Sequence, residues 1–171
     1  MVIHRGSIEN DIKRLILDVR KVMEPFTAKA LKVTKKNSLK DFISIAGPLH
    51  VTHLLIFTQT DLNDHMKIVR LPRGPTIHFK LEEFSLCNDV MSIMKKKITH
   101  KKQFLQQPLL ILNGFNTSLS HQPNHSDGSS SNTSNIDVHH KLLATTLQNM
   151  FPCINVTKVS SLIKFGFIFR N

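Results

Sequence analysis

The feature that most constrains the fold is a run of consecutive apolar residues near the middle of the chain. Leu54, Leu55, Ile56 and Phe57 follow one another within residues 53–58. A strand exposed on one side alternates apolar and polar residues, so an unbroken run indicates a strand covered on both faces. We therefore expect an α/β layer fold, in which strands alternate with helices.

Other segments carry weaker strand patterns. Residues 66–71 and 77–81 place apolar side chains at every second position or nearly so, with a polar turn at residues 60–64 before them. Residues 109–112 predict another buried strand, and residues 163–169 are apolar and strand-like. A short apolar run at 42–45 is closed by a Gly-Pro pair, and residues 34–38 are expected to form a loop.

Three helices are predicted from helical spacing of apolar residues. The first would be capped by Ser7 and end near Pro25. Its basic residues, which lie largely outside the apolar stripe, would face solvent; they are Lys13, Arg14, Arg20 and Lys21. The second would cover residues 86–97 and end in a lysine run, which is favourable at any helix C-terminus. The third would be capped by Asp137 and stopped by Pro152.

Residues 117–137 differ sharply in composition from the rest. They contain seven Ser, and Leu119 and Ile136 are their only large apolar residues. Such a segment cannot bury enough apolar surface to offset the entropy of ordering, so we expect disorder.

Composition excludes several classes of protein. Apolar residues make up 40% of the 171, and no stretch approaches the ~20 apolar residues that a membrane span needs. The first ten residues lack the apolar centre of a signal peptide. Cys87 and Cys153 stand in unrelated contexts, which favours free thiols in a reducing compartment.

The net charge of +11 is unevenly distributed. Residues 1–40 carry +6, residues 41–92 carry −2, residues 93–102 carry +5 and residues 103–171 carry +2. Clustered cations of this kind are typical of a protein with a polyanionic partner. The alternative is a solvated basic surface without a partner.

The loop LPRGPT at residues 71–76 separates two of the predicted strands. Pro72 and Pro75 stiffen it, Gly74 tolerates positive φ, and Arg73 is expected to point outward. A guanidinium on a stiff loop suits a phosphate or carboxylate, although a simple turn is the alternative. Arg5 lies just before the first predicted helix, whose N-terminus also suits a phosphate.

The sequence does not support catalysis, a metal site or a cofactor. It has no nucleotide-binding, serine-hydrolase or zinc-protease motif, and its cysteines and ten histidines show no four-ligand spacing. Glu82 and Glu83 would point to opposite faces of a regular strand, which makes them a poor acid–base pair.

Six blocks of sequence resemble the Brix-domain family of ribosome-assembly factors, and within it the Peter Pan subfamily. They are VIHRG (2–6), LDVRKVMEPFTAKALKV (17–33), KKNSLKDFISIAGPLHVTHLLIFTQT (35–60), KIVRLPRGPTIHFKLEEFSLCNDV (67–90), PLLILNGF (108–115) and KLLATTLQNMFPCINVTKV (141–159). Their order is that of the subfamily, and together they span nearly the whole chain apart from residues 116–140.

The resemblance implies a domain of two similar α/β halves, each like the anticodon-binding domain of class II aminoacyl-tRNA synthetases. Residues 1–115 would be the N-terminal half, residues 116–137 an inserted low-complexity segment, and residues 138–171 the beginning of an incomplete second half. We therefore expect a C-terminally truncated form.

The resemblance also implies a non-catalytic factor in the nucleus and nucleolus that binds pre-rRNA, large-subunit precursor particles and a protein partner, without a membrane or small-molecule substrate. The alternatives are a basic protein-interaction module without RNA contact, or a non-functional fragment. The residues expected to bind RNA are Arg5, Lys13, Arg14, Lys32, Lys35, Lys36, Arg73, Lys95, Lys96, Lys97, Lys101 and Lys102.

Overall fold

A computed structural model describes residues 1–34, 36–95, 109–115, 131–151 and 166–170 of the chain. The chain forms two compact units, Met1–Gln106 and Gln107–Asn171, and each is described by itself. The expected mixed α/β architecture is confirmed.

The first unit is built on a four-stranded sheet with the strand order β1-β2-β3-β4. Strand β1 pairs parallel with β2, and the remaining pairs are antiparallel. In chain order its elements are β1 (Val2–Arg5), α1 (Asn10–Val22), α2 (Leu39–Ala46), β2 (His53–Gln59), β3 (Asp64–Arg70), β4 (Thr76–Leu81) and α3 (Cys87–Ile93).

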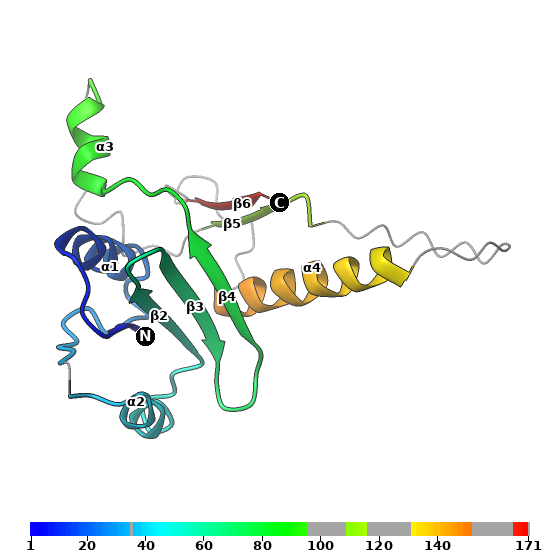
Figure 1. Cartoon of the computed structure of the whole chain (residues 1–171), viewed down its shortest axis with the longest axis horizontal. Helices are drawn as coiled ribbons and strands as arrows, with labels where there is room; N and C mark the ends of the chain where they lie inside the picture. The colour runs from blue at the N-terminus through cyan, green and yellow to red at the C-terminus, as the bar shows by residue number, and fades with distance from the viewer. Residues whose placement is uncertain (35, 96–108, 116–130, 152–165, 171) are drawn as a thin grey trace, which may run out of the picture. The chain divides into compact units, whose positions relative to one another are not determined.

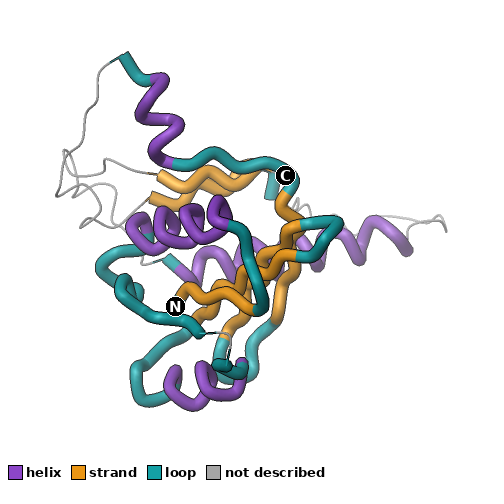
Figure 2. The backbone as a smooth tube through the Cα atoms, turned by 60° about the vertical axis from the view of Figure 1, so that its left-hand side comes forward, coloured by secondary structure: helices purple, strands orange, loops and turns teal. Residues whose placement is uncertain are grey.

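Strand β2 is buried on both faces, as its sequence predicts. Leu54 and Ile56 join Ile3 of β1 and Phe42 of α2 in one core cluster. Leu55 and Phe57 alternate with them and are buried on the other face of the sheet. Helices α1 and α2 lie on opposite sides of the sheet, with the strands between them (Figures 1 and 2).

Helix α1 corrects two predictions. It begins after Glu9, which makes no side-chain capping bond, so Ser7 is not its cap. Arg20 is not a solvent-facing cation, because its side chain is only 6% exposed. Its guanidinium donates to the carbonyl of Val2 at 2.8 Å and to that of Leu31 at 2.9 Å. Arg20 therefore ties α1 to the edge strand β1.

Helix α2 was not among the three predicted helices, although its sequence contains a capping box. The Ser38 hydroxyl accepts a hydrogen bond from the Asp41 amide, and the Asp41 carboxylate accepts one from the Ser38 amide at 2.8 Å. These bonds satisfy amides that would otherwise be unpaired at the helix start. Phe42 and Ala46 then face the sheet.

The LPRGPT loop closes the β3–β4 hairpin. The Gly74 amide donates to the Arg70 carbonyl at 3.2 Å, and the Arg70 amide donates to the Pro75 carbonyl at 3.1 Å. A Cβ atom on Gly74 would collide with the first three side-chain carbons of Arg70. Glycine is thus needed here for close approach, whereas the positive φ angles among described glycines belong to Gly6 and Gly114.

Helix α3 is shorter than predicted and ends at Ile93, before the lysine run. The Asp18 carboxylate of α1 accepts a hydrogen bond from the Cys87 amide at 3.0 Å, which fixes the start of α3. No residue of α3 is buried, and Ile93 is 83% exposed.

The second unit contains β5 (Leu109–Asn113), α4 (Ser131–Met150) and β6 (Gly166–Arg170). Strand β5 pairs parallel with β6 and is partly exposed, so the prediction of a buried strand is wrong. Strand β5 lies in the unit Gln107–Asn171 together with its partner β6.

Helix α4 begins earlier than predicted. It starts at Ser131, so Asp137 lies inside the helix and does not cap it, and residues 131–137 are helical where disorder was expected. Residues 116–130 lie outside the described part of the chain. Leu147 is fully buried, whereas Leu142, expected on the same apolar face, is 44% exposed.

Candidate nucleic-acid interface

Five basic side chains lie on the α2 side of the four-stranded sheet, and we call them the basic face. Arg5, Thr58, His65 and Lys80 are direct neighbours across β1, β2, β3 and β4. The next row on the same side contains Ile3, Ile56, Lys67 and His78. The basic face comprises Arg5, His65, Lys67, His78 and Lys80.

Strand alternation collects these residues on one side. In β3, His65 and Lys67 share a side with Val69, and in β4, His78 and Lys80 share it with Thr76. Neither of the two rows contains an acidic residue. Asp64 belongs to the row of Gln59 and Leu81, which faces the other side.

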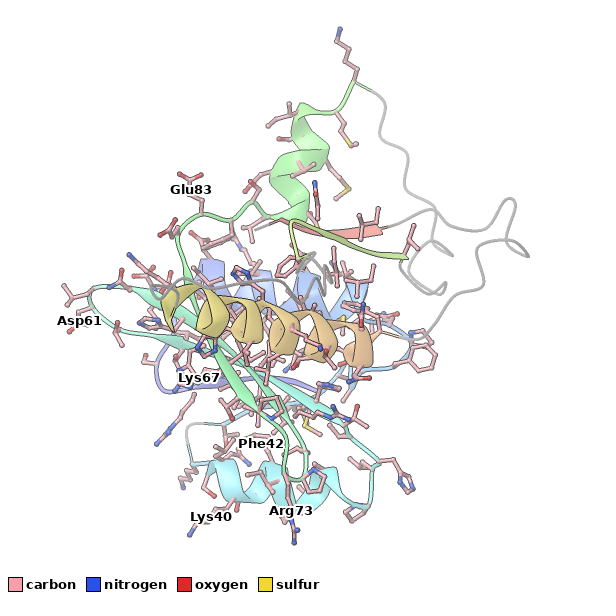
Figure 3. The ribbon with its side chains drawn as sticks, turned by 90° about the vertical axis from the view of Figure 1, so that its right-hand side faces the viewer. Lys40, Phe42, Asp61, Lys67, Arg73 and Glu83 are labelled. Carbon is pink, nitrogen blue, oxygen red and sulfur yellow. The ribbon has the colours of Figure 1, made fainter. Side chains whose placement is uncertain are left out.

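The apolar half of this side is covered by α2, and the basic half lies beyond it. Phe42 packs against Ile3, Leu54 and Ile56. Figure 3 shows Lys67 on the sheet and Phe42 between the sheet and α2, with Asp61 at the far tip of the β2–β3 turn. Arg5, His78 and Lys80 are exposed, while His65 and Lys67 are half-buried.

A hollow of about 410 Å³ adjoins the Arg5 end of the basic face. Arg5, Gly6 and Lys36 are among the residues that line it. Gly6 has a φ of 81°, which turns the chain sharply after Arg5. A smaller cavity of about 60 Å³ beside it is lined by Arg5, Phe42 and Lys67, among others. Lys36 therefore extends the basic face.

The cations of the basic face are not neutralised by ion pairs within the described residues. The ion pairs found there are Arg14–Asp11, Lys21–Asp18 and Lys29–Glu24, all outside the basic face. Lys80 also lines a hollow together with the carboxylates Asp61, Asp64 and Glu82. Away from Lys80, the basic face presents positive charge of the kind that attracts a polyanion.

The structure brings together only part of the predicted RNA-binding set. Arg5 and Lys36 line one hollow. Arg73 is exposed on the hairpin, at the end of the strands opposite Arg5, and points away from the sheet (Figure 3). The two arginines therefore do not form one site.

The other predicted residues are dispersed or lie outside the described part. Lys13 and Arg14 are exposed on α1, on the other side of the sheet, and Arg14 lies 3.6 Å from the Asp11 carboxylate. Lys32 and Lys95 are exposed in loops. The predicted residues outside the described part are Lys35, Lys96, Lys97, Lys101 and Lys102.

Sequence reasoning missed four members of the basic face: His65, Lys67, His78 and Lys80. Charge summed along the sequence hides them, because residues 41–92 carry a net charge of −2. The signal that could have found them is the two-residue spacing of His65 and Lys67, and of His78 and Lys80, on the two strands that flank the LPRGPT loop.

Two further histidines are structural. Burial lowers the pKa of His53, and the nearby charges of Arg70 and the amino terminus lower it further. Burial also lowers the pKa of His4; a hydrogen bond with the Gly6 backbone partly opposes this effect, and the charges of Arg20 and Lys13 lower the pKa further. Both histidines lie on the α1 side of the sheet and favour the neutral form.

The described residues include no group of three or more His, Cys, Asp or Glu side chains that could hold a metal ion. Among these residues there is also no helix of the length and apolarity that crossing a membrane requires.

Comparison with known proteins assigns the family. The Brix domain matches residues 6–168. The chain belongs to the Brix-domain family. It is 45% identical over 159 residues to Suppressor of SWI4 1 homolog of Homo sapiens, covering 93% of this chain and 30% of that protein. It is 42% identical to Protein Peter pan of Drosophila melanogaster, covering 93% and 31%.

The name of a third relative states its biological process. Ribosome biogenesis protein SSF2 of Saccharomyces cerevisiae is 39% identical over 166 residues, covering 94% of this chain and 35% of that protein. The chain thus spans about a third of the length of these relatives. The predicted resemblance to the Peter Pan group of Brix-domain proteins is confirmed.

Proposed function

We propose that this chain is a non-catalytic factor in maturation of the large ribosomal subunit, and that it binds pre-rRNA through the basic face. The observation that carries the proposal is the set of five basic side chains on one side of the sheet, with Lys36 at its end. The name of the yeast relative, a ribosome biogenesis protein, supplies the biological context.

The proposed mechanism is scaffolding. Phosphate contacts hold a pre-rRNA segment against the sheet and delay its alternative folding until processing has advanced. Such contacts position RNA without reading its sequence. The strands keep the cations at fixed spacing. Binding therefore costs less conformational entropy than it would for cations on a mobile tail.

We propose further points that membership of the Brix-domain family supports. The chain acts in the nucleus and nucleolus, on pre-ribosomal particles and together with another assembly factor. Its two units correspond to halves like the anticodon-binding domain of class II aminoacyl-tRNA synthetases. Lys13, Arg14, Lys32, Arg73 and Lys95 remain candidates for secondary contacts.

Cross-linking in cells tests this proposal. Ultraviolet cross-linking of the tagged chain, followed by sequencing of attached RNA, should enrich discrete sites in large-subunit pre-rRNA. In vitro, the logarithm of affinity should fall linearly with the logarithm of salt concentration, by roughly 0.7 to 0.9 per phosphate neutralised.

Two outcomes would contradict the proposal. Absent cross-links with protein partners that survive RNase digestion would identify a protein-interaction module. Retained binding with a salt slope near zero would exclude phosphate contacts as its basis. An extended form of the chain serves as the comparison, because this chain spans 30% of the human relative.

A further inference from the structure

We infer that the basic face binds the sugar–phosphate backbone of double-helical RNA and does not bind unstacked bases of a single strand. The inference rests on the proposed function and specifies its substrate class. Proteins bind single strands through aromatic platforms on which bases stack, whereas they recognise duplex RNA through phosphates and 2′-hydroxyls. The side chains on each side of the sheet distinguish these two modes.

The sheet places its phenylalanines on the other side. Phe57, Met66 and Phe79 form one row across β2, β3 and β4, with His4 of β1 beside them. This row alternates with the two basic rows and therefore faces away from α2. The aromatic side chains of the strands are thus unavailable to RNA bound on the basic face.

The α2 side has no phenylalanine platform either. Phe42 points at the sheet from α2 and is buried in the core. The chain contains no Trp and no Tyr, and the exposed phenylalanines among the described residues, Phe26 and Phe84, lie outside the four strands. The described strands therefore present aliphatic and basic groups on this side, with imidazole as their one kind of ring.

The two imidazoles lie among lysines. His65 stands directly across from Lys80, and His78 stands directly across from Lys67. Each imidazole therefore has a lysine directly across from it, close enough for both to contact the same ligand. The arrangement provides nitrogen donors for phosphate and 2′-hydroxyl oxygens, which are the groups displayed across the minor groove of A-form RNA.

The cations also extend in two directions. Arg5 and Lys80 lie on the first and last of four strands, roughly 14 Å apart at the ordinary strand spacing. The Lys67 row lies roughly 7 Å from the Arg5 row along the strands. A set of basic side chains of this width can contact both sugar–phosphate backbones of a duplex. One extended single strand would contact only the side chains along a single path across the sheet.

The test compares three RNAs of equal length at one salt concentration. The probes are a 16-base-pair duplex, a 16-nucleotide strand without secondary structure, and the same strand with abasic sites at alternate positions. We expect the duplex to bind at least about fivefold more tightly than the single strand. We expect the abasic strand to bind within about twofold of the intact strand, because stacking contributes little.

Variants assign the effect to the basic face. Lys80→Gln and His78→Gln are exposed changes that should each weaken duplex binding about threefold or more. Lys21→Gln on α1 is the control, because Lys21 is exposed and is not an RNA-binding candidate, and it should leave duplex binding unchanged. A duplex affinity that responds to Lys21 but not to Lys80 and His78 would overturn the inference.

Two other results would overturn it. Tighter binding of the intact single strand than of the duplex, with a loss of tenfold or more for the abasic strand, would show base stacking while leaving the proposed function in place. Failure of all three RNAs to bind would refute both the proposed function and this inference.

Discussion

The two sides of the four-stranded sheet use the same backbone for different purposes. The α1 side carries Val2, Leu55, Phe57 and Ile68, all buried, together with the buried His53 and the half-buried His4. The α2 side is apolar only where Phe42 covers it, and it becomes basic and exposed beyond that point. The comparison shows that the α1 side is mostly buried, as stability requires, whereas the α2 side exposes basic side chains.

The largest expected effect comes from the α1 side. Phe57→Ala removes one of the largest fully buried side chains and should lower the free energy of unfolding by about 3–5 kcal/mol. Urea denaturation followed by circular dichroism measures this loss. His78→Ala is the matched change on the basic face and should alter the free energy of unfolding by less than about 0.5 kcal/mol. Equal losses for both would show that the two sides do not differ in this way.

Arg20 extends the comparison between the two sides of the sheet, because it is a cation whose hydrogen bonds stabilise the fold. Arg20→Ala leaves the carbonyls of Val2 and Leu31 without their donor, and should cost about 2–3 kcal/mol of the free energy of unfolding. Arg14→Ala on the same helix removes an exposed 3.6 Å ion pair and should cost less than about 0.5 kcal/mol. Thermal unfolding of both variants distinguishes them. An Arg20→Ala protein as stable as Arg14→Ala would contradict the structural role.

The histidines give a smaller, pH-dependent contrast. A lowered pKa means that the unfolded chain binds more protons than the folded chain, so His53 and His4 reduce stability as pH falls below about 6.5 and have no such effect well above it. His53→Gln should flatten the fall in stability between roughly pH 7 and pH 5. His78→Gln is the control on the basic face and should leave that fall unchanged. The same slope in wild type and His53→Gln would exclude His53 as a source of the pH dependence.

Much of the fold follows from periodicity in the sequence. The run from Leu54 to Phe57 predicts the strand buried on both faces, and the alternation of Ile77, Phe79 and Leu81 predicts β4. Helix α2 was not predicted, because it is only eight residues long and depends on its capping box and on the contact of Phe42 with the sheet. Short helices of this kind are stabilised by tertiary packing more than by propensity.

The candidate site was less predictable from the sequence. A sum of charge over a segment does not show that alternate residues of a strand lie on opposite sides of the sheet. Arg5 was identified from its place before a predicted helix and Lys36 from the cluster of lysines around it, and the hollow brings the two together. Arg20 was assigned to solvent because sequence spacing does not show that a guanidinium can bond carbonyls of two distant segments. Lys67 and Lys80 required the register of β3 against β4, which periodicity alone does not supply.

The most direct test reverses equal amounts of charge on and off the basic face. One variant carries Lys67→Glu and Lys80→Glu on the basic face, and the other, the α1 variant, carries Lys21→Glu on α1 and Lys29→Glu in the segment after it, where both lysines are exposed. Both change the net charge equally, so a non-specific effect of charge would weaken RNA binding equally. Affinity for large-subunit pre-rRNA fragments is measured for each by fluorescence anisotropy over a range of salt concentrations. The account predicts a loss of at least about tenfold and a salt slope reduced by roughly two for the basic-face variant, with little change for the α1 variant. Equal losses, or a larger loss for the α1 variant, would contradict it.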